Sequence, residues 1–200
     1  MKKKLIFATG NAHKMDEIRM ILKDTGLDIL SMREAGVTVN AEENGKTFEE
    51  NAIIKATALC SATGELALAD DSGLEIDYLN KEPGIYSARY MGEDTSYRIK
   101  NANLIERLNG VPDEKRTARF VCAMAAAFPN GHIETVRGVM EGRIAYAEAG
   151  INGFGYDPIF YLPEYGCTSA ELTPEDKNAI SHRGQAVRIM KYRLLKLGII

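Results

Sequence analysis

Residues 4–22 read KLIFATGNAHKMDEIRMIL, a short apolar run that leads directly into a glycine-containing turn and a helical pattern. Apolar side chains recur at helical spacing after the turn, and Gly26 closes the element. We therefore expect a buried strand over residues 4–9, followed at once by a helix.

The rest of the chain continues this mixture of strands and helices. We expect further strands at 27–31, 66–69, 74–79, 119–128 and 132–139, the last two joined by a hairpin at Pro129-Asn130-Gly131. Thr47 and Glu50 form a capping box that opens a helix running to about residue 63. Other helices are expected over 96–108, after Thr173 and after Ser181. The pattern predicts one domain over residues 1–200, with an α/β or α+β fold and a mixed sheet.

Composition narrows the class of protein. Hydrophobic residues make up 45% and charged residues 26%, as in ordinary globular proteins, and the net charge of −3 gives no basic field for long nucleic acid. The three cysteines lie far apart without a CxxC pair, which disfavours a zinc site or a disulfide framework. The apolar run after Lys4 is too short for a signal peptide, and no segment is long enough to span a membrane. We expect a cytoplasmic protein.

The first candidate site is the turn Thr9-Gly10-Asn11-Ala12-His13-Lys14. A strand that ends in such a turn presents free backbone N–H groups at a helix N-terminus, where the helix dipole favours a phosphate and Lys14 adds a positive charge. In the alternative reading, Asn11 only caps a helix and Lys14 is solvated. The GxxxxGK[ST] pattern of a P-loop is absent from the sequence.

The second candidate site is acidic. Asp70-Asp71-Ser72-Gly73 follows the buried strand at 66–69, and we expect Ser72-Gly73 to form a turn that exposes both acids. Adjacent side chains on a strand point to opposite faces, so at most one of the two aims directly at a given ion. Glu42-Glu43 could supply a further ligand, and such hard oxygen ligands suit Mg²⁺. A plain acidic turn is the alternative.

Two further segments could bind the rest of a nucleotide. Gly153-Phe154-Gly155-Tyr156-Asp157-Pro158 lacks the last glycine of a dinucleotide fingerprint, but a Phe154 exposed between glycines could stack on a base. Lys177 and Ser181-His182-Arg183 carry donors near two helix starts, suited to a phosphate or a base carbonyl. A core aromatic and a surface His–Arg pair are the alternatives.

Together these segments resemble the inosine triphosphate pyrophosphatase-like family. The matching segments, in order, are TGNAHKMDE at 9–17, EENGKTFEENAIIKA at 42–56, ADDSGLEID at 69–77, PGIYSARY at 83–90, GFGYDPIF at 153–160 and KNAISHRGQA at 177–186. Each segment alone is weak, but six in order over about 180 residues make a specific match. Asn44 departs slightly from the family pattern, which often has Thr before this glycine.

The resemblance implies an elongated mixed β-sheet with helices that form two lobes around a deep central cleft, a Mg²⁺ requirement and a homodimer. It places Thr9, Asn11 and Lys14 at the triphosphate. It also assigns the metal to Glu43 and Asp71, with Asp70 as a possible further ligand. Asp71 falls on the proton acceptor, so Asp71, Lys14 and Lys55 form the expected catalytic set. Ser72 flanks this site. The expected base and sugar pocket consists of Phe154, Gly155, Tyr156, Asp157, Lys177, His182 and Arg183.

The activity that this resemblance implies is hydrolysis of non-standard purine nucleoside triphosphates, ITP, dITP and XTP, to the monophosphate and pyrophosphate. In the expected mechanism, Mg²⁺ and the lysines neutralise the triphosphate, and Asp71 orients or deprotonates the attacking water. A nucleotide-sensing binding protein on the same scaffold is the alternative function.

Overall fold

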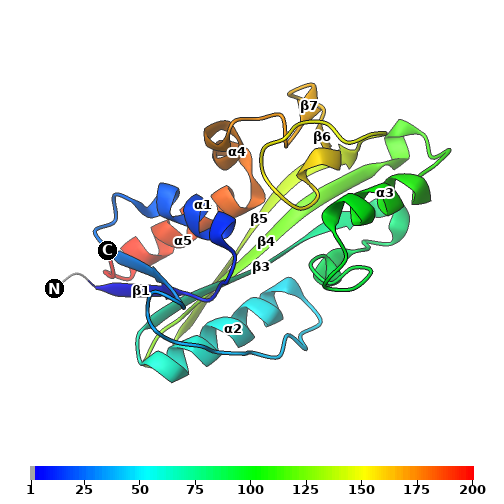
Figure 1. Cartoon of the computed structure of the whole chain (residues 1–200). Helices are drawn as coiled ribbons and strands as arrows, with labels where there is room; N and C mark the ends of the chain where they lie inside the picture. Colours follow the sequence, from blue (N-terminus) through cyan, green and yellow to red (C-terminus); the bar gives the residue numbers. More distant parts are fainter. Residues whose placement is uncertain (1–2) are drawn as a thin grey trace. The chain divides into compact units, whose positions relative to one another are not determined.

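The computed structural model describes residues 3–200, which form two compact units. Of the described residues, the first unit comprises 3–71, Cys122–Gly138 and His182–Ile200, and the second comprises Ser72–Val121 and Val139–Ser181. Within the described residues, seven strands form a mixed sheet in the order β2-β1-β3-β4-β5-β6-β7 (Figure 1). The predicted α/β fold with a mixed sheet is confirmed, whereas the predicted lobes and central cleft stay a prediction.

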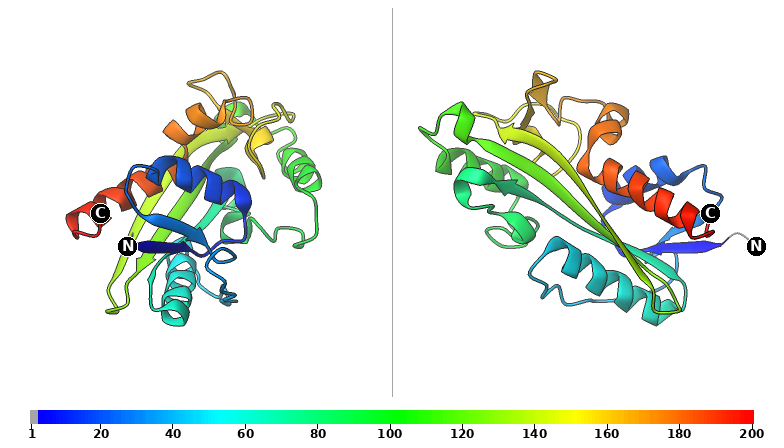
Figure 2. Two further views of the ribbon diagram at one scale, coloured as in Figure 1. Left: turned by 60° about the vertical axis from the view of Figure 1, so that its left-hand side comes forward. Right: turned by 180° about the vertical axis from the view of Figure 1, so that it is seen from behind.

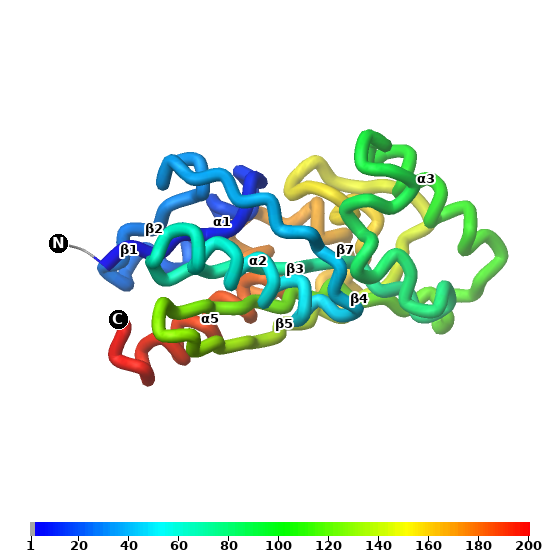
Figure 3. The backbone as a smooth tube through the Cα atoms, turned by 90° about the horizontal axis from the view of Figure 1, so that it is seen from below, coloured from blue at the N-terminus to red at the C-terminus, as the bar shows by residue number. Residues whose placement is uncertain are grey.

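The first unit is a sheet covered by helices on both faces. Parallel pairing joins β1 to both β2 and β3. Helices α1 and α5 lie side by side on one face, and α2 lies on the other (Figures 1 and 2). From below, α2 passes in front of the strands and α5 behind them (Figure 3). The elements are β1 (Lys4–Phe7), α1 (Ala12–Leu22), β2 (Asp28–Ser31), α2 (Phe48–Thr63), parts of β3 (Leu66–Ile76), β4 (Thr117–Ala127) and β5 (Ile133–Ile144), and α5 (His182–Lys196).

One apolar core holds α1 and α5 against the strands. Leu5, Phe7 and Leu68 from the sheet are fully buried against Ile18 of α1 and Val187 of α5. Burial of each large aliphatic side chain stabilises the fold by about 1.5–3 kcal/mol, so this contact fixes where the first residues of both helices lie. The predicted helical spacing after the first turn is confirmed, because it places the apolar stripe of α1 on this core.

The second unit has its own core around the other halves of β3, β4 and β5. Leu104 of α3 packs with Leu74, Phe120 and Phe160 in this cluster. The short helix at Asp157–Ile159 contacts both α3 and β7. The remaining elements are α3 (Tyr97–Arg107), β6 (Phe160–Leu162), β7 (Cys167–Thr168), α4 (Pro174–Ile180) and short 3₁₀ helices at Asp77–Leu79, Gly84–Tyr86 and Asp113–Lys115.

Several local predictions are confirmed. Thr47 Oγ1 accepts from the Glu50 backbone N–H at 3.1 Å and begins α2, although the Glu50 carboxylate turns to the Lys46 N–H. The helix ends at Gly64, whose φ of +66° suits a residue without a side chain. The hairpin around Gly131 joins neighbouring strands β4 and β5.

The expected turn at Asp70-Asp71-Ser72-Gly73 is wrong. Strand β3 runs without a break from Leu66 to Ile76, and Asp70 and Asp71 are buried within it, with 1% and 7% of their surface exposed. Local preference for a turn is overridden because the strand lies in the sheet and both carboxylates find cationic partners there.

Within residues 3–200, none of the helices is long and apolar enough to cross a membrane.

Candidate active site

The turn after β1 leads into the capped start of α1. Asn11 caps the helix, since its side chain accepts from the Lys14 N–H at 3.3 Å, and the Thr9 hydroxyl accepts from the Asn11 N–H at 3.1 Å. No described atom lies within 4 Å of where a Cβ on Gly10 would stand, so this turn is open on that side. Asn11 therefore does cap the helix, as the alternative reading held, and the phosphate-binding role of this turn stays a prediction.

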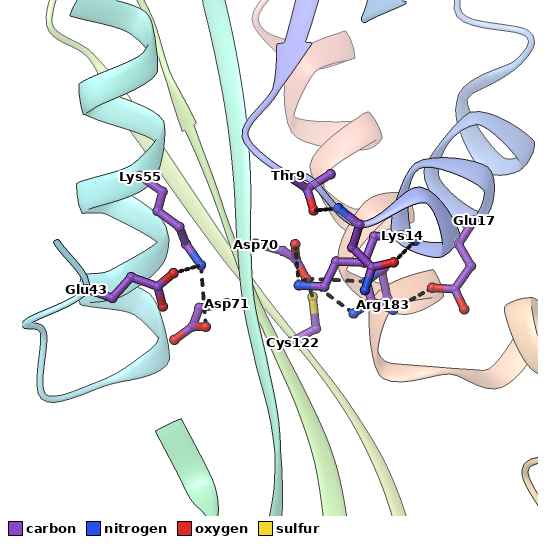
Figure 4. Close-up of polar contacts among 10 residues, drawn as sticks. Thr9, Lys14, Glu17, Glu43, Lys55, Asp70, Asp71, Cys122 and Arg183 are labelled. Carbon is purple, nitrogen blue, oxygen red and sulfur yellow. Dashed lines mark hydrogen bonds and ion pairs between the residues drawn. The ribbon is translucent and has the colours of Figure 1, made fainter. Parts of the chain in front are cut away.

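Lys14 does not extend into solvent but binds Asp70. Its ammonium lies 3.0 and 2.9 Å from the two carboxylate oxygens, and the Asp70 side chain is completely buried. Arg183, from the first turn of α5, binds the same carboxylate at 3.3 Å and also pairs with Glu17 of α1. Burial opposes the charge of Arg183, but Asp70 and Glu17 raise the pKa of this guanidinium above its ordinary value. We call Lys14, Glu17, Asp70 and Arg183 the α1 cluster (Figure 4).

A close approach of β5 to α5 sets the position of Arg183. A Cβ on Gly138 would stand 2.1 Å from the His182 carbonyl oxygen and 2.8 Å from the Ala186 nitrogen. Such distances are far inside contact, so this strand position requires glycine for α5 to begin where it does.

A second set of charges lies on the opposite face of β3. The Lys55 ammonium of α2 lies 3.2 Å from Glu43 Oε1 and 3.5 Å from Asp71 Oδ1. The other Asp71 oxygen accepts from the side-chain amide of Asn51 at 3.0 Å. We call Glu43, Asn51, Lys55 and Asp71 the α2 cluster; all but Asn51 are labelled in Figure 4.

The α2 cluster holds more carboxylate than cation. Burial raises the pKa of Asp71, and this effect, together with Glu43 and Asp70, outweighs the opposing influence of Lys55 and Asn51. Burial also disfavours the charge of Lys55, yet Asp71, Asp70 and Glu43 raise the pKa of that ammonium. A further positive charge at this position would therefore be stabilised.

The two clusters are built on consecutive residues of β3, beyond the part of the strand that pairs with β1. The ladder between β1 and β3 ends at Phe7 and Leu68, and Asp70 and Asp71 are the second and third residues after Leu68 in β3. Their alternation sends one carboxylate toward α1 and α5 and the other toward α2, as Figure 4 shows. The sequence placed Lys14, Lys55 and Asp71 in one catalytic set, whereas the structure pairs Lys14 with Asp70 and Lys55 with Asp71.

The second unit contains the glycine-rich segment and Lys177. Asp157 is buried; its carboxylate accepts from the Lys177 ammonium at 2.6 Å and from the Phe154 backbone N–H at 2.7 Å. The same ammonium stands 5.0 Å from the centre of the Phe154 ring. Ser169 donates a further hydrogen bond to Asp157. Phe154 is half-buried rather than fully exposed, and Tyr156 is a core residue.

The expected base and sugar pocket is drawn from both units. Lys177 and residues 154–157 belong to the second unit, while His182 and Arg183 open α5 in the first. Ser72, expected beside the acids, is the first residue of the second unit and lies within β3. Their joint role as one pocket stays a prediction.

Sequence reasoning missed several partners of these residues. Glu17 and Asn51 belong to the two clusters of the first unit, and Asn101 donates to the Gly155 carbonyl in the second. Glu17 lies one helical turn after Lys14, a spacing that could have placed both on one face of α1. Asn51 is one turn before Lys55 on α2 and could have been found in the same way.

The donor set fits a hard divalent cation. Among residues 3–200, no group of three or more His, Cys, Asp or Glu side chains is placed to hold a metal ion alone. Glu43 and Asp71 offer two carboxylates near one point, and Mg²⁺ commonly takes one or two protein carboxylates together with substrate phosphates.

A mixed sheet covered by helices, a capped start of α1, and two lysine–carboxylate clusters on consecutive residues of β3 define an α/β protein with a charged site. The Ham1 family model matches residues 5–193, and the chain belongs to that family.

Similar proteins cover nearly the whole chain. A dITP/XTP pyrophosphatase of Clostridium perfringens is 49% identical over 198 residues, which covers 96% of this chain and 97% of the relative. The Bacillus subtilis protein of the same name is 47% identical, covering 93% and 94%. Among solved structures, a HAM1 protein from Coxiella burnetii has a TM-score of 0.89 at 42% identity, covering 97% and 99%. A dITP/XTP pyrophosphatase from Mycobacterium abscessus has a TM-score of 0.75 at 41% identity, covering 94% and 98%.

The contacts of the α1 cluster predict that replacing one buried carboxylate by an amide strongly destabilises the protein. Asp70→Asn should lower the free energy of unfolding by roughly 3 kcal/mol, because it removes the buried anion that neutralises Lys14 and Arg183. Urea unfolding measures this loss. Asp24→Asn is the matched control, because Asp24 pairs with Lys191 at the surface and its loss should leave the midpoint unchanged. Equal midpoints for the two variants would contradict the central place of Asp70.

Proposed function

We propose that this protein hydrolyses the non-standard purine nucleotides ITP, dITP and XTP to the monophosphate and pyrophosphate, and so removes them from the nucleotide pool. Membership of the Ham1 family and similarity to the dITP/XTP pyrophosphatases support this activity. The observation that carries it is the pair of lysine–carboxylate clusters built on Asp70 and Asp71, consecutive residues of β3.

Charge neutralisation is the first requirement of the reaction. Water that attacks a phosphorus within a triphosphate meets strong repulsion from the phosphate oxygens. Lys14 and the first N–H groups of α1 bind the triphosphate, together with Thr9 and Asn11, and Lys55 approaches it from α2. These fixed charges stabilise the departing pyrophosphate without reorganisation during the reaction.

Glu43 and Asp71 are the residues that would hold Mg²⁺. When bound, Mg²⁺ neutralises phosphate oxygens and polarises water. Lys55 contacts both carboxylates, which supports its assignment beside the phosphates that the metal would neutralise. Asp70 was a possible third ligand; its carboxylate is already shared by Lys14 and Arg183 on the other face of β3, so we assign it to positioning these two cations.

Asp71 also orients or deprotonates the water that attacks the α-phosphorus. One Asp71 oxygen is held by Asn51, which leaves the other to face the reacting groups. The products of attack at this phosphorus are the monophosphate and pyrophosphate.

Base recognition belongs to the segment around Phe154. Asp157 holds the Phe154 backbone and Lys177 together, so that an aromatic face and a cation occupy one place. Donors of Lys177, His182 or Arg183 pair with the O6 carbonyl of inosine and xanthosine, which adenine lacks. A buried donor left facing the adenine amino group disfavours ATP. Of these three donors, Arg183 is the least suited to bind O6, because its guanidinium already binds Asp70 and Glu17.

In this proposal the protein acts as a homodimer, as the resemblance implies, and in the cytoplasm, as the separated cysteines and the short apolar run after Lys4 suggest. The alternative is a nucleotide-sensing protein on the same scaffold, which would bind the nucleotide without hydrolysing it.

Product analysis tests the activity directly. With ITP and Mg²⁺ the protein should release IMP and pyrophosphate, and EDTA should stop the reaction until Mg²⁺ is restored. Ion-exchange chromatography separates the possible products. IDP with phosphate would indicate a phosphatase, and tight ITP binding without any product would favour the sensor.

Asp71→Asn tests the assigned proton acceptor. We expect kcat to fall by at least about 10³-fold while ITP binding changes little, because the amide keeps the shape of the side chain but cannot accept the proton. Stopped-time assays and calorimetry with ITP give the two quantities. Normal kcat with lost binding would contradict the assignment.

Substrate comparison tests the reading of O6. At matched concentrations, kcat/KM for ITP and XTP should exceed that for ATP by about 10²-fold or more. The donors proposed here do not distinguish GTP from ITP, because both carry O6. A lower kcat/KM for GTP than for ITP would therefore show that another contact excludes GTP. Equal rates for ITP and ATP would refute O6 recognition.

A further inference from the structure

The amide of Asn51 connects the carboxylate of Asp71 to the backbone of Gly45, two residues after Glu43. Asn51 lies in the first turn of α2 and is completely buried. Its Nδ2 donates to Asp71 Oδ2 at 3.0 Å, and its Oδ1 accepts from the Gly45 backbone N–H at 2.9 Å. The segment that carries Glu43 and the strand that carries Asp71 are thus tied to opposite ends of one planar group.

Gly45 shows how closely this segment approaches Asn51. A Cβ at position 45 would stand 2.6 Å from Asn51 Oδ1 and 2.9 Å from the Asn51 nitrogen. Both distances are shorter than real Cβ contacts, so any side chain here would push the segment away from α2. Glycine at this position and the Asn51 amide are therefore two parts of one attachment.

The two hydrogen bonds of Asn51, to Gly45 and to Asp71, determine which carboxylate oxygens are available to a metal between Glu43 and Asp71. Because Asn51 occupies Asp71 Oδ2, the free rotation of this carboxylate is lost and Oδ1 is the oxygen near Lys55. Glu43 is two residues before Gly45; its side chain is 32% exposed, and its carboxylate contacts the Lys55 ammonium at 3.2 Å. Groups that orient metal ligands in this way typically change metal affinity or activity by about 10–100-fold.

We propose that Asn51 is a positioning residue, which sets the orientation of Asp71 and the distance of Glu43 from it, and so prepares both acids for the divalent cation. The inference rests on the function proposed above. It assigns no contact between Asn51 and the nucleotide.

The alternative is that Asn51 only stabilises the start of α2. Thr47 supplies the matched control, because its hydroxyl caps the same helix turn by accepting from the Glu50 N–H and lies outside the attachment. Thr47→Ala weakens the helix start but leaves the two bonds of Asn51 in place.

The experiment compares wild type, Asn51→Ala, Gly45→Ala and Thr47→Ala in the full chain. Calorimetry with Mn²⁺ in the absence of nucleotide gives the metal affinity, assays with ITP at saturating Mg²⁺ give kcat and KM, and urea unfolding gives the stability. We expect Asn51→Ala to weaken Mn²⁺ binding and to lower kcat, each by about 10–100-fold, with KM for ITP within about threefold. Gly45→Ala should change the same quantities in the same direction, and Thr47→Ala only the stability.

Each other outcome counts against the proposal. Wild-type Mn²⁺ affinity and kcat in a folded Asn51→Ala protein would overturn it, as would equal losses in Asn51→Ala and Thr47→Ala. Should Asn51→Ala fail to fold, unchanged Mn²⁺ affinity in Gly45→Ala would overturn it as well. If the wild-type protein binds no Mn²⁺, Glu43 and Asp71 do not form a metal site, and the proposal for Asn51 is overturned. Failure of the proposed function is distinct: wild type would then yield no IMP and pyrophosphate.

Discussion

Two consecutive carboxylates buried in one strand are the constraint on which the site depends. Asp70 and Asp71 lie in the middle of β3, where a charged group is stable only if a partner reaches it. The pleat of the strand sends them to opposite faces, so each face must supply its own cation. Lys14 of α1 supplies one and Lys55 of α2 the other. The helices that cover the sheet are therefore also the source of its charge balance.

The motif over residues 42–56 has a single physical explanation. Glu43 provides a carboxylate, Gly45 allows the segment to approach α2, and Thr47 begins the helix. Asn51 and Lys55 follow at one-turn intervals and point to the same strand residue, Asp71. A helix start, a close backbone contact and a charged cluster are thus encoded in about fifteen residues.

Local features could be predicted from the sequence because short-range rules decide them. The cap at Thr47 and the hairpin at Gly131 depend on residues a few positions apart. The strand through Asp70 could not be predicted in this way, since its acids are neutralised by Lys14, 56 positions away, and Arg183, 113 positions away. The grouping of candidate residues also needed the pleat of β3 and the membership of α5 in the first unit, neither of which a motif reveals.

The first unit is assembled from three separate segments of the chain. Lys14 and Arg183, which share Asp70, are separated by most of the sequence, and α5 packs beside α1 only after both intervening pieces have been made. During synthesis on the ribosome, β1 and α1 must therefore wait with their apolar side uncovered until residues 182–200 emerge. The α1 cluster can therefore form only near the end of synthesis, when Arg183 can join Lys14 at Asp70.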